Sequence, residues 1–183
     1  MKITNRYYIL FLILCGCFAL LFAAHGTRLA SDYEITDQDG LSHSFTAPFQ
    51  RIISLYPAHT ENLAAMGADK ALIGISSSDT YPESILHKKR FSYHDTIEKF
   101  ISAQPDCVLI RPMIRRSAGN LIEKLQKYGV VVISLQPTTP KELYDYWHQL
   151  GLISGQTANA SLITKAFKDK LGHLTSEVQS IPR

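Results

Sequence analysis

The stretch from Arg51 to Ile75 constrains the fold more than any other part of this 183-residue chain. It reads RIISLYPAHTENLAAMGADKALIGI: an apolar run, a proline-marked loop, a short helical pattern ending at Gly67, and a second apolar run at 71–75. A short apolar strand without polar alternation is buried on both faces, so helices must cover both sides and its neighbour must be parallel. Ligands bind such sheets at loops leaving the carboxyl ends of strands. The loop at 56–60 is therefore the first candidate for a functional site.

Strand and helix patterns alternate along the rest of the chain. Two further apolar runs, at 107–110 and 130–135, predict buried strands, and alternating residues around Asp39-Gly40 predict a hairpin. Helices are predicted at 96–103, from about 117 to 128, from 139 to near 155, and at 157–178. The pattern predicts an α/β fold, namely a single Rossmann-like lobe with a mostly parallel sheet followed by one long helix.

Local signals mark the helix starts and the exposed segments. Asp95, with Glu98 three residues later, resembles a capping box, and Thr139-Pro140 followed by Glu142 predicts another helix start. The cluster Lys88-Lys89-Arg90 is typical of a solvated surface. Residues 111–116 are predicted to form the loop that leaves the third buried strand.

Residues 1–30 have the layout of a signal peptide or signal anchor. Lys2 and Arg6 precede an uncharged apolar run at 7–24. Leu14-Cys15-Gly16-Cys17 resembles a bacterial lipobox, so cleavage, retention as an anchor and lipidation at Cys17 are alternative outcomes. Each of them places the rest of the chain outside the cytoplasm, in the periplasm or an equivalent compartment.

Charge and cysteine content exclude some functions. The formal net charge is +3, and because the leader holds three basic residues and no acidic one, the remainder is neutral. A neutral body argues against a nucleic-acid partner. Cys107 is the only cysteine after the leader, so no internal disulfide can form there, and its apolar setting predicts a core residue.

The motif Arg-Ile-Ile-Ser-Leu-x-Pro-x-x-Thr-Glu-x-Leu-x-x-x-Gly at 51–67, followed by Leu-Ile-Gly-Ile at 72–75, resembles a known family. It is similar to the opening of ABC-transporter substrate-binding proteins for cobalamin, haem and ferric siderophores. Segments 79–82, 97–108 and 125–132 resemble later motifs of that family in the same order.

Family members have two α/β lobes joined by one long backbone helix. The resemblance therefore implies that 31–156 is an N-terminal lobe and 157–183 the start of the inter-lobe helix, with the second lobe absent from the sequence. Whether a separate chain supplies this lobe is left open. The implied function is to capture an iron-siderophore, haem or cobalamin-type chelate outside the cytoplasmic membrane and deliver it to an ABC permease in the inner membrane. No cofactor and no catalysis are implied.

The resemblance and the strand-exit positions together nominate site residues. Arg111 falls where cobalamin binders carry a ligand-facing Trp, and an arginine fork suits the oxyanions of an anionic chelate. The expected ligand-binding residues are Tyr56, Pro57, Tyr81, Tyr93, Arg111 and Arg115. Glu61 matches the family glutamate that pairs with permease arginines; the alternative is a first-turn helix acid favoured by the macrodipole.

Other functions remain as alternatives. His59 and His94 follow strand or segment ends, which would suit a direct zinc or manganese binder. A ligand-free module that docks on a permease is a further alternative. Ser78, Asp79 and His94 lie on the same predicted rim, but the sequence has no nucleophile elbow, phosphate-binding glycine loop or HExxH motif, so an enzyme is not expected.

Overall fold

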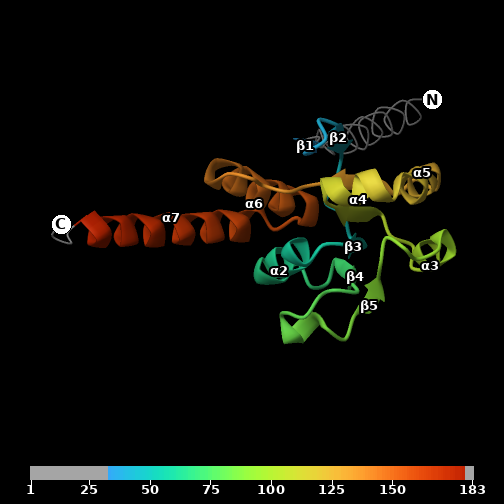
Figure 1. The fold of residues 1–183 in the computed structure, drawn as a ribbon, viewed down its shortest axis with the longest axis horizontal. Helices are drawn as coiled ribbons and strands as arrows, with labels where there is room; N and C mark the ends of the chain where they lie inside the picture. Colours follow the sequence, from blue (N-terminus) through green and yellow to red (C-terminus); the bar gives the residue numbers. More distant parts are fainter. Residues whose placement is uncertain (1–32, 180–183) are drawn as a thin grey trace, which may run out of the picture. The chain divides into compact units, whose positions relative to one another are not determined.

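A computed structural model describes residues 33–179, so the predicted leader and Cys17 lie outside the described residues. The elements are β1 (Tyr33–Thr36), β2 (Ser42–Phe45), β3 (Ile52–Ser54), α2 (Pro57–Ala65), β4 (Leu72–Ser76), η1 (Glu83–Ile85), β5 (Lys89–Phe91), α3 (Ile97–Ile101), β6 (Cys107–Ile110), α4 (Pro112–Ser117), α5 (Gly119–Lys127), β7 (Val131–Ser134), α6 (Pro140–Ser154) and α7 (Thr157–Gln179). Figure 1 shows them in sequence colours. The predicted α/β fold with a long final helix is confirmed.

The main sheet has five strands in the order β5-β4-β3-β6-β7, and every neighbouring pair is parallel. The chain moves outward from β3 through β4 to β5, then returns to the other side of β3 for β6 and β7. The winding direction therefore reverses between β3 and β6. In open parallel sheets, ligands bind outside the carboxyl ends of the strands at such a switch point.

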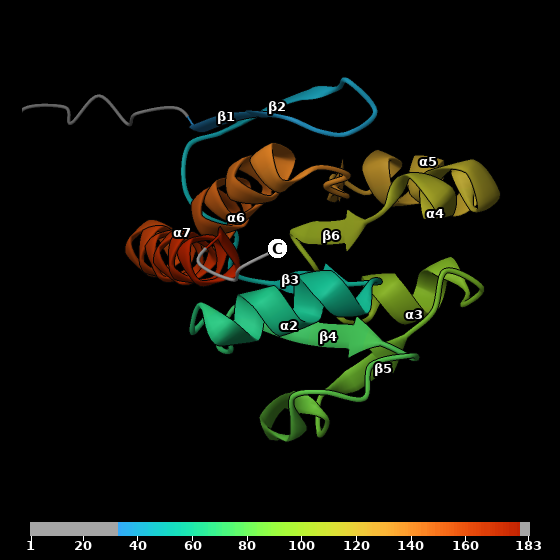
Figure 2. The ribbon, with the colours of Figure 1, turned by 60° about the vertical axis from the view of Figure 1, so that its left-hand side comes forward.

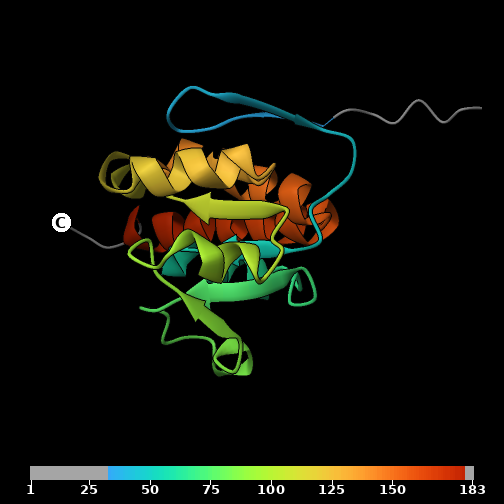
Figure 3. The same cartoon turned by 90° about the vertical axis from the view of Figure 1, so that its right-hand side faces the viewer.

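Successive side chains of the central strands point to opposite faces, and each face has its own helices. Ile52, Cys107 and Leu109 belong to the cluster that includes residues of α2 and α6. Ile53 and Val108 belong to the cluster that includes residues of α3, α4 and α5. Figure 2 shows the first set of helices in front of the sheet and Figure 3 shows the second. Burial on both faces explains why these strands are mainly apolar and do not alternate with exposed polar residues.

The edge strand β5 was not predicted, whereas the solvated surface expected at 88–90 is confirmed for Lys89 and Arg90, which are exposed, and Lys88 is half-buried. Phe91 is fully buried and lies over Gly74 of β4, where an added Cβ would come within 2.5 Å of the Phe91 ring. Arg90 donates to the carbonyl oxygens of Asp79 at 2.9 Å and Ser77 at 3.3 Å, and Lys88 donates to the Asp69 carbonyl at 2.8 Å. Hydrogen bonds from Lys88 and Arg90 therefore connect the cluster to the neighbouring loops.

Helix starts differ from the prediction at two places. Residues 112–117 form the short helix α4, with Pro112 in the first helical position, where a loop was expected. Thr96, and not Asp95, is the N-cap of α3; the Asp95 carboxylate accepts from the Ser92 N–H at 2.7 Å and from Lys99. The predicted cap at Thr139 is confirmed, since its side chain accepts from the Glu142 N–H.

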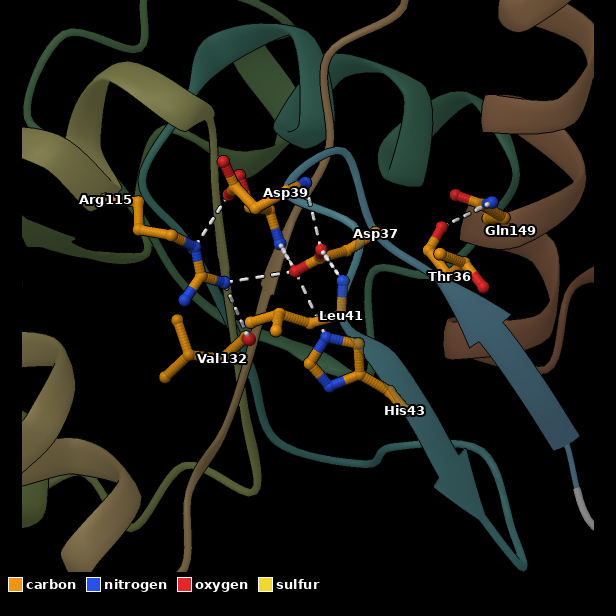
Figure 4. Close-up of polar contacts among 9 residues, drawn as sticks. Thr36, Asp37, Asp39, Leu41, His43, Arg115, Val132 and Gln149 are labelled. Atoms are coloured by element: carbon orange, nitrogen blue, oxygen red, sulfur yellow. Dashed lines mark hydrogen bonds and ion pairs between the residues drawn. The ribbon is translucent and has the colours of Figure 1, made fainter.

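The hairpin of β1 and β2 is fastened to the sheet through Asp37, which lies in the turn (Figure 4). Its carboxylate side chain is fully buried and accepts from the N–H groups of Asp39 and Leu41, from the N–H of Ser134 at the end of β7, and from Arg115 of α4 at 3.1 Å. The Nε2 atom of His43 lies 3.1 Å from the Asp37 Oδ2 atom. Burial on its own raises the pKa of Asp37, but the hydrogen bonds and the Arg115 charge outweigh it and lower the pKa.

Helices α6 and α7 pack closely at Gly151, where an added Cβ would lie 2.8 Å from the Ala160 side chain. Further along α7 the apolar side chains of Leu171, Leu174 and Val178 are exposed. Within residues 33–179, no helix is both long and apolar enough to cross a membrane.

Candidate functional site

A groove of about 460 Å³ opens at the carboxyl ends of β3, β4, β5 and β6, the edge that the sequence pattern indicated. Each of these strands, or the loop that follows it, contributes to the walls. The lining residues are Leu55, Tyr56, Pro57, Ser76, Ser77, Ser78, Ser92, Tyr93, His94, Arg111, Met113 and Ile114. The groove combines aromatic rings, hydroxyl groups and one guanidinium, which suits a partly apolar ligand with polar edges.

Four of the nominated residues meet in this groove. Tyr56 and Pro57 follow β3, Tyr93 follows β5, and Arg111 follows β6. Tyr81, by contrast, is 65% exposed and is not among the lining residues. The folded chain therefore gathers one cation and two tyrosines from three separate segments.

Arg115 lies on α4 but contacts the hairpin and not the groove. Its Nε donates to Asp39 at 2.6 Å and its Nη2 donates to Asp37 at 3.1 Å (Figure 4). The side chain is only 19% exposed. The short helix α4 explains the difference: in the expected loop Arg111 and Arg115 could share a surface, but here Arg115 is held by two carboxylates. We exclude Arg115 from the candidate site.

Arg111 is the central charged group of the groove. It is the N-cap residue of α4, in extended backbone geometry, and its guanidinium carbon lies 4.8 Å from the centre of the Tyr56 ring. This is within the range of a cation–π interaction. Its Nε atom is buried and has no hydrogen-bond partner in the part of the chain that the structure describes. A buried guanidinium N–H without a partner is suited to donate a hydrogen bond to an oxyanion of a ligand.

The end of β4 and the serine-rich loop after it form another part of the lining. The Ser76 and Ser78 hydroxyls lie 2.8 Å apart, and the buried carboxylate of Asp79 accepts from the Ser76 N–H and from the Thr60 hydroxyl. Burial raises the pKa of Asp79, although these hydrogen bonds and Arg90 act in the opposite direction. Asp79 thus ties the loop after β4 to α2, and its buried Oδ1 has no partner among the described residues.

His59 is a core residue, and this removes it from the metal-binding alternative. The side chain is fully buried, Nε2 lies 3.0 Å from the Ile110 carbonyl oxygen, and Nδ1 lies 2.8 Å from the Tyr146 hydroxyl. With both nitrogens engaged, it has no lone pair left for a metal. Residues 33–179 contain no group of three or more His, Cys, Asp or Glu side chains that could hold a metal ion.

Glu61 is exposed on α2, close in sequence to the groove residues Tyr56 and Pro57. Pro57 is the first residue of this helix, so Glu61 is beyond the first turn, which contains no acidic residue. The alternative of a first-turn acid that interacts with the helix dipole is therefore wrong for Glu61. Its carboxylate faces solvent, where a partner protein can reach it.

Sequence reasoning missed several parts of the site. Ser92 and Met113 line the groove only because β5 and α4 form, and neither element was predicted. Tyr146 supports the groove from α6, 87 residues from its partner His59. A second cavity, of about 400 Å³, is lined by α6 and α7 residues, including Tyr144 and Lys168, and contains none of the strand-end residues.

Comparison with known proteins identifies relatives of this chain by sequence and by structure. No family model matches the chain. An ABC transporter substrate-binding lipoprotein of Bacillus subtilis strain 168, YvrC, is 25% identical over 136 residues, which is 73% of this chain and 43% of YvrC. The vitamin B12-binding protein of Vibrio vulnificus strain YJ016 is 30% identical over 142 residues, 75% of this chain and 50% of that protein.

Solved structures share the fold. The crystal structure of a possible iron-binding (periplasmic solute-binding) protein from Staphylococcus epidermidis ATCC 12228 superposes with a TM-score of 0.67 at 28% identity, covering 74% of this chain and 54% of that one. The chain spans about half the length of the curated relatives it matches. By sequence and by fold it is homologous to ABC-transporter substrate-binding proteins. Within that family, vitamin B12-binding proteins are among its relatives.

Proposed function

We propose that this chain is the substrate-binding component of an ABC import system and that it captures a metal chelate in the groove at the strand ends. The observation that supports this most directly is the convergence of Tyr56, Tyr93 and Arg111 at the switch point of a sheet with this family's fold. The groove binds and releases its ligand without making or breaking a bond. The ligand class is an iron-siderophore, haem or cobalamin-type chelate.

Arg111 favours chelates that carry carboxylates or other oxyanions. Its Nε lacks a partner and its guanidinium lies on Tyr56, so an anionic group would gain a charge-assisted hydrogen bond in a partly desolvated place. Among the proposed classes, haem with its propionates and acidic ferric siderophores meet this requirement better than a ligand without an acidic group.

The experiment is a titration of the purified protein with haemin, cyanocobalamin and a panel of ferric siderophores, followed by quenching of tyrosine and tryptophan fluorescence. Arg111→Ala is expected to weaken binding of an anionic chelate by about 10-fold to 100-fold, from the loss of one charge-assisted hydrogen bond. Arg116→Ala is the matched control, because Arg116 is exposed on α4 and does not line the groove. Saturable binding that both variants retain equally would refute the role of Arg111.

We also propose that Glu61 contacts an arginine of the permease. It is exposed beside the groove loop and matches the family glutamate. Glu61→Arg should abolish co-purification with the cognate permease and leave chelate affinity unchanged. Glu123→Arg, an exposed charge reversal on α5, should leave both unchanged. If no chelate binds while permease association persists, the chain is the ligand-free docking module.

Finally, we propose that residues 1–30 direct export and that Cys17 carries a lipid. Metabolic labelling with palmitate should mark the wild-type protein and not Cys17→Ser. If neither the wild-type protein nor Cys17→Ser is labelled and both are found outside the cytoplasm, the leader is cleaved or acts as an anchor without lipid. If the wild-type protein is found in the cytoplasm, export is refuted.

A further inference from the structure

His59 is buried beneath the groove with a fixed protonation pattern. The carbonyl oxygen of Ile110, 3.0 Å from Nε2, can only accept, so Nε2 carries the proton. Nδ1 then accepts from the Tyr146 hydroxyl at 2.8 Å. Burial lowers the pKa of His59 to about 4; the Ile110 carbonyl opposes this and the Arg111 charge adds to it. The imidazole is therefore neutral at physiological pH, and the chain of hydrogen bonds runs from Tyr146 through His59 to Ile110.

This chain of hydrogen bonds ends on the backbone that carries Arg111. The Ile110 carbonyl, which also accepts from the Leu135 N–H at 2.9 Å, belongs to the peptide group that joins Ile110 to Arg111. The Leu135 N–H holds this oxygen from the sheet and His59 holds it from α2, so the two donors together fix the plane of the peptide and the direction in which the Arg111 side chain leaves β6. Arg111 also begins α4, so the same contact sets the start of that helix.

The His59 ring touches the second groove residue as well. It meets the Tyr56 ring edge to face, with centroids 5.1 Å apart and an interplanar angle of 84°. Tyr56 in turn lies 4.8 Å from the Arg111 guanidinium. One buried side chain therefore contacts the backbone of the cation and the ring on which the cation rests.

Burying an imidazole is costly unless both of its ring nitrogens are hydrogen-bonded. An apolar residue would fill the same space without that requirement, so the two hydrogen bonds of His59 call for an explanation beyond packing. We propose that His59, oriented by Tyr146, is a positioning residue that sets the geometry of the Arg111–Tyr56 pair for an oxyanion of the ligand. This inference rests on the proposed function of the groove. It assigns no ligand contact to His59 itself.

The first test needs no ligand. In ¹⁵N-labelled protein, the side-chain Nε–H resonance of Arg111, assigned by its loss in Arg111→Lys, reports the guanidinium environment. His59→Phe removes the side-chain donor to Ile110 and leaves the Leu135 N–H in place, and His59→Gln restores an amide donor near the Nε2 position. We expect a large shift of the Arg111 resonance in His59→Phe and a position nearer to wild type in His59→Gln, with Arg51 unchanged. An unchanged Arg111 resonance in folded His59→Phe would overturn the proposal.

The second test measures affinity for haemin as a probe with two carboxylates. His59→Phe should weaken haemin binding about 10-fold when Arg111 is present and less than about 2-fold in an Arg111→Ala background, because the two residues act as one unit. Equal losses in both backgrounds would indicate a merely structural role and refute the positioning role. Tyr146→Phe, which removes only one hydroxyl, gives the same comparison if His59→Phe does not fold. If wild-type protein binds no haemin, the proposed haem function fails, and the resonance test still decides the role of His59.

Discussion

Replacing Asp37 with asparagine should destabilise the protein strongly, because the carboxylate is the single acceptor for five donors. Asparagine preserves the shape but presents an NH₂ group where one oxygen was. If its remaining oxygen stays with Asp39 and Leu41, the NH₂ group faces the N–H of Ser134 and the donors of His43 and Arg115. The Ser134 N–H and His43 then lose their acceptor, and Arg115 keeps only Asp39 and, at 3.4 Å, the Val132 carbonyl oxygen.

The magnitude follows from burial. Removing one partner of a buried ion pair costs about 3–5 kcal/mol. The Arg115 side chain is 19% exposed and can turn partly to water, whereas the Ser134 N–H is buried and cannot. We therefore expect Asp37→Asn to lower the free energy of unfolding by about 3 kcal/mol. The loss is felt globally because Ile35 and Phe45 of the hairpin belong to the core cluster shared with α6.

Urea unfolding followed by circular dichroism measures this loss, and hydrogen exchange of the Gln38 N–H, which donates to the Ser134 carbonyl at 2.8 Å, localises it. Asp39→Asn is the matched control, since the Asp39 side chain is 24% exposed and its ion pair with Arg115 is a single contact. It should cost less than about 1 kcal/mol. Equal unfolding midpoints for the two variants would refute the reasoning.

The same carboxylate predicts an acid dependence. The folded-state pKa of Asp37 is lowered from its ordinary value of 3.8. Its contribution to stability is therefore present above about pH 4 and is lost as the pH falls through the lower folded-state value. The difference in unfolding free energy between wild type and Asp37→Asn should shrink progressively below pH 4. A difference that stays constant down to the acid limit of the folded protein would show that ionisation of Asp37 is not its source.

Other predictions concern packing. Leu150→Ala should lower the free energy of unfolding by about 2–5 kcal/mol, because Leu150 is fully buried, whereas Leu174→Ala, at a side chain 49% exposed, should change it by less than about 0.5 kcal/mol. Gly74→Ala should lower the free energy of unfolding by about 1–3 kcal/mol, because the new methyl group meets the Phe91 ring. Gly119→Ala should not lower it, because a Cβ added at Gly119 meets no neighbouring atom within 4 Å. Chemical denaturation decides each pair, and similar losses within either pair would contradict the packing described.

The fold was predictable where the sequence carries a strong local signal. The run at 107–110 is apolar throughout, and the run at 52–55 is interrupted only by the buried Ser54, because both faces of their strands are buried. The cap at Thr139 is made by residues next to it in sequence. Strand β5 has only Phe91 buried of its three residues, so its sequence gave no strand pattern. Its position depends on the absence of a side chain at Gly74, a contact that only the folded sheet creates.

The site was predictable in part for the same reason. Strand ends are readable from the sequence, so Tyr56 and Arg111 could be placed at one edge. The direction in which Arg115 points from α4 could not be predicted, because it depends on ion pairs with the hairpin carboxylates of Asp37 and Asp39. His59 and Tyr146 are 87 residues apart, and no local pattern links them.

These distant contacts hold α4 from two directions. At its start, the Ile110 carbonyl before Arg111 accepts from His59 of α2. One turn further along, Arg115 donates to Asp37 of the hairpin and, at 3.4 Å, to the Val132 carbonyl of β7. Because separate elements fix both places, α4 has little freedom to rotate about its axis. The direction of the Arg111 side chain is thus set before a ligand arrives, and preorganisation of this kind reduces the entropy lost on binding.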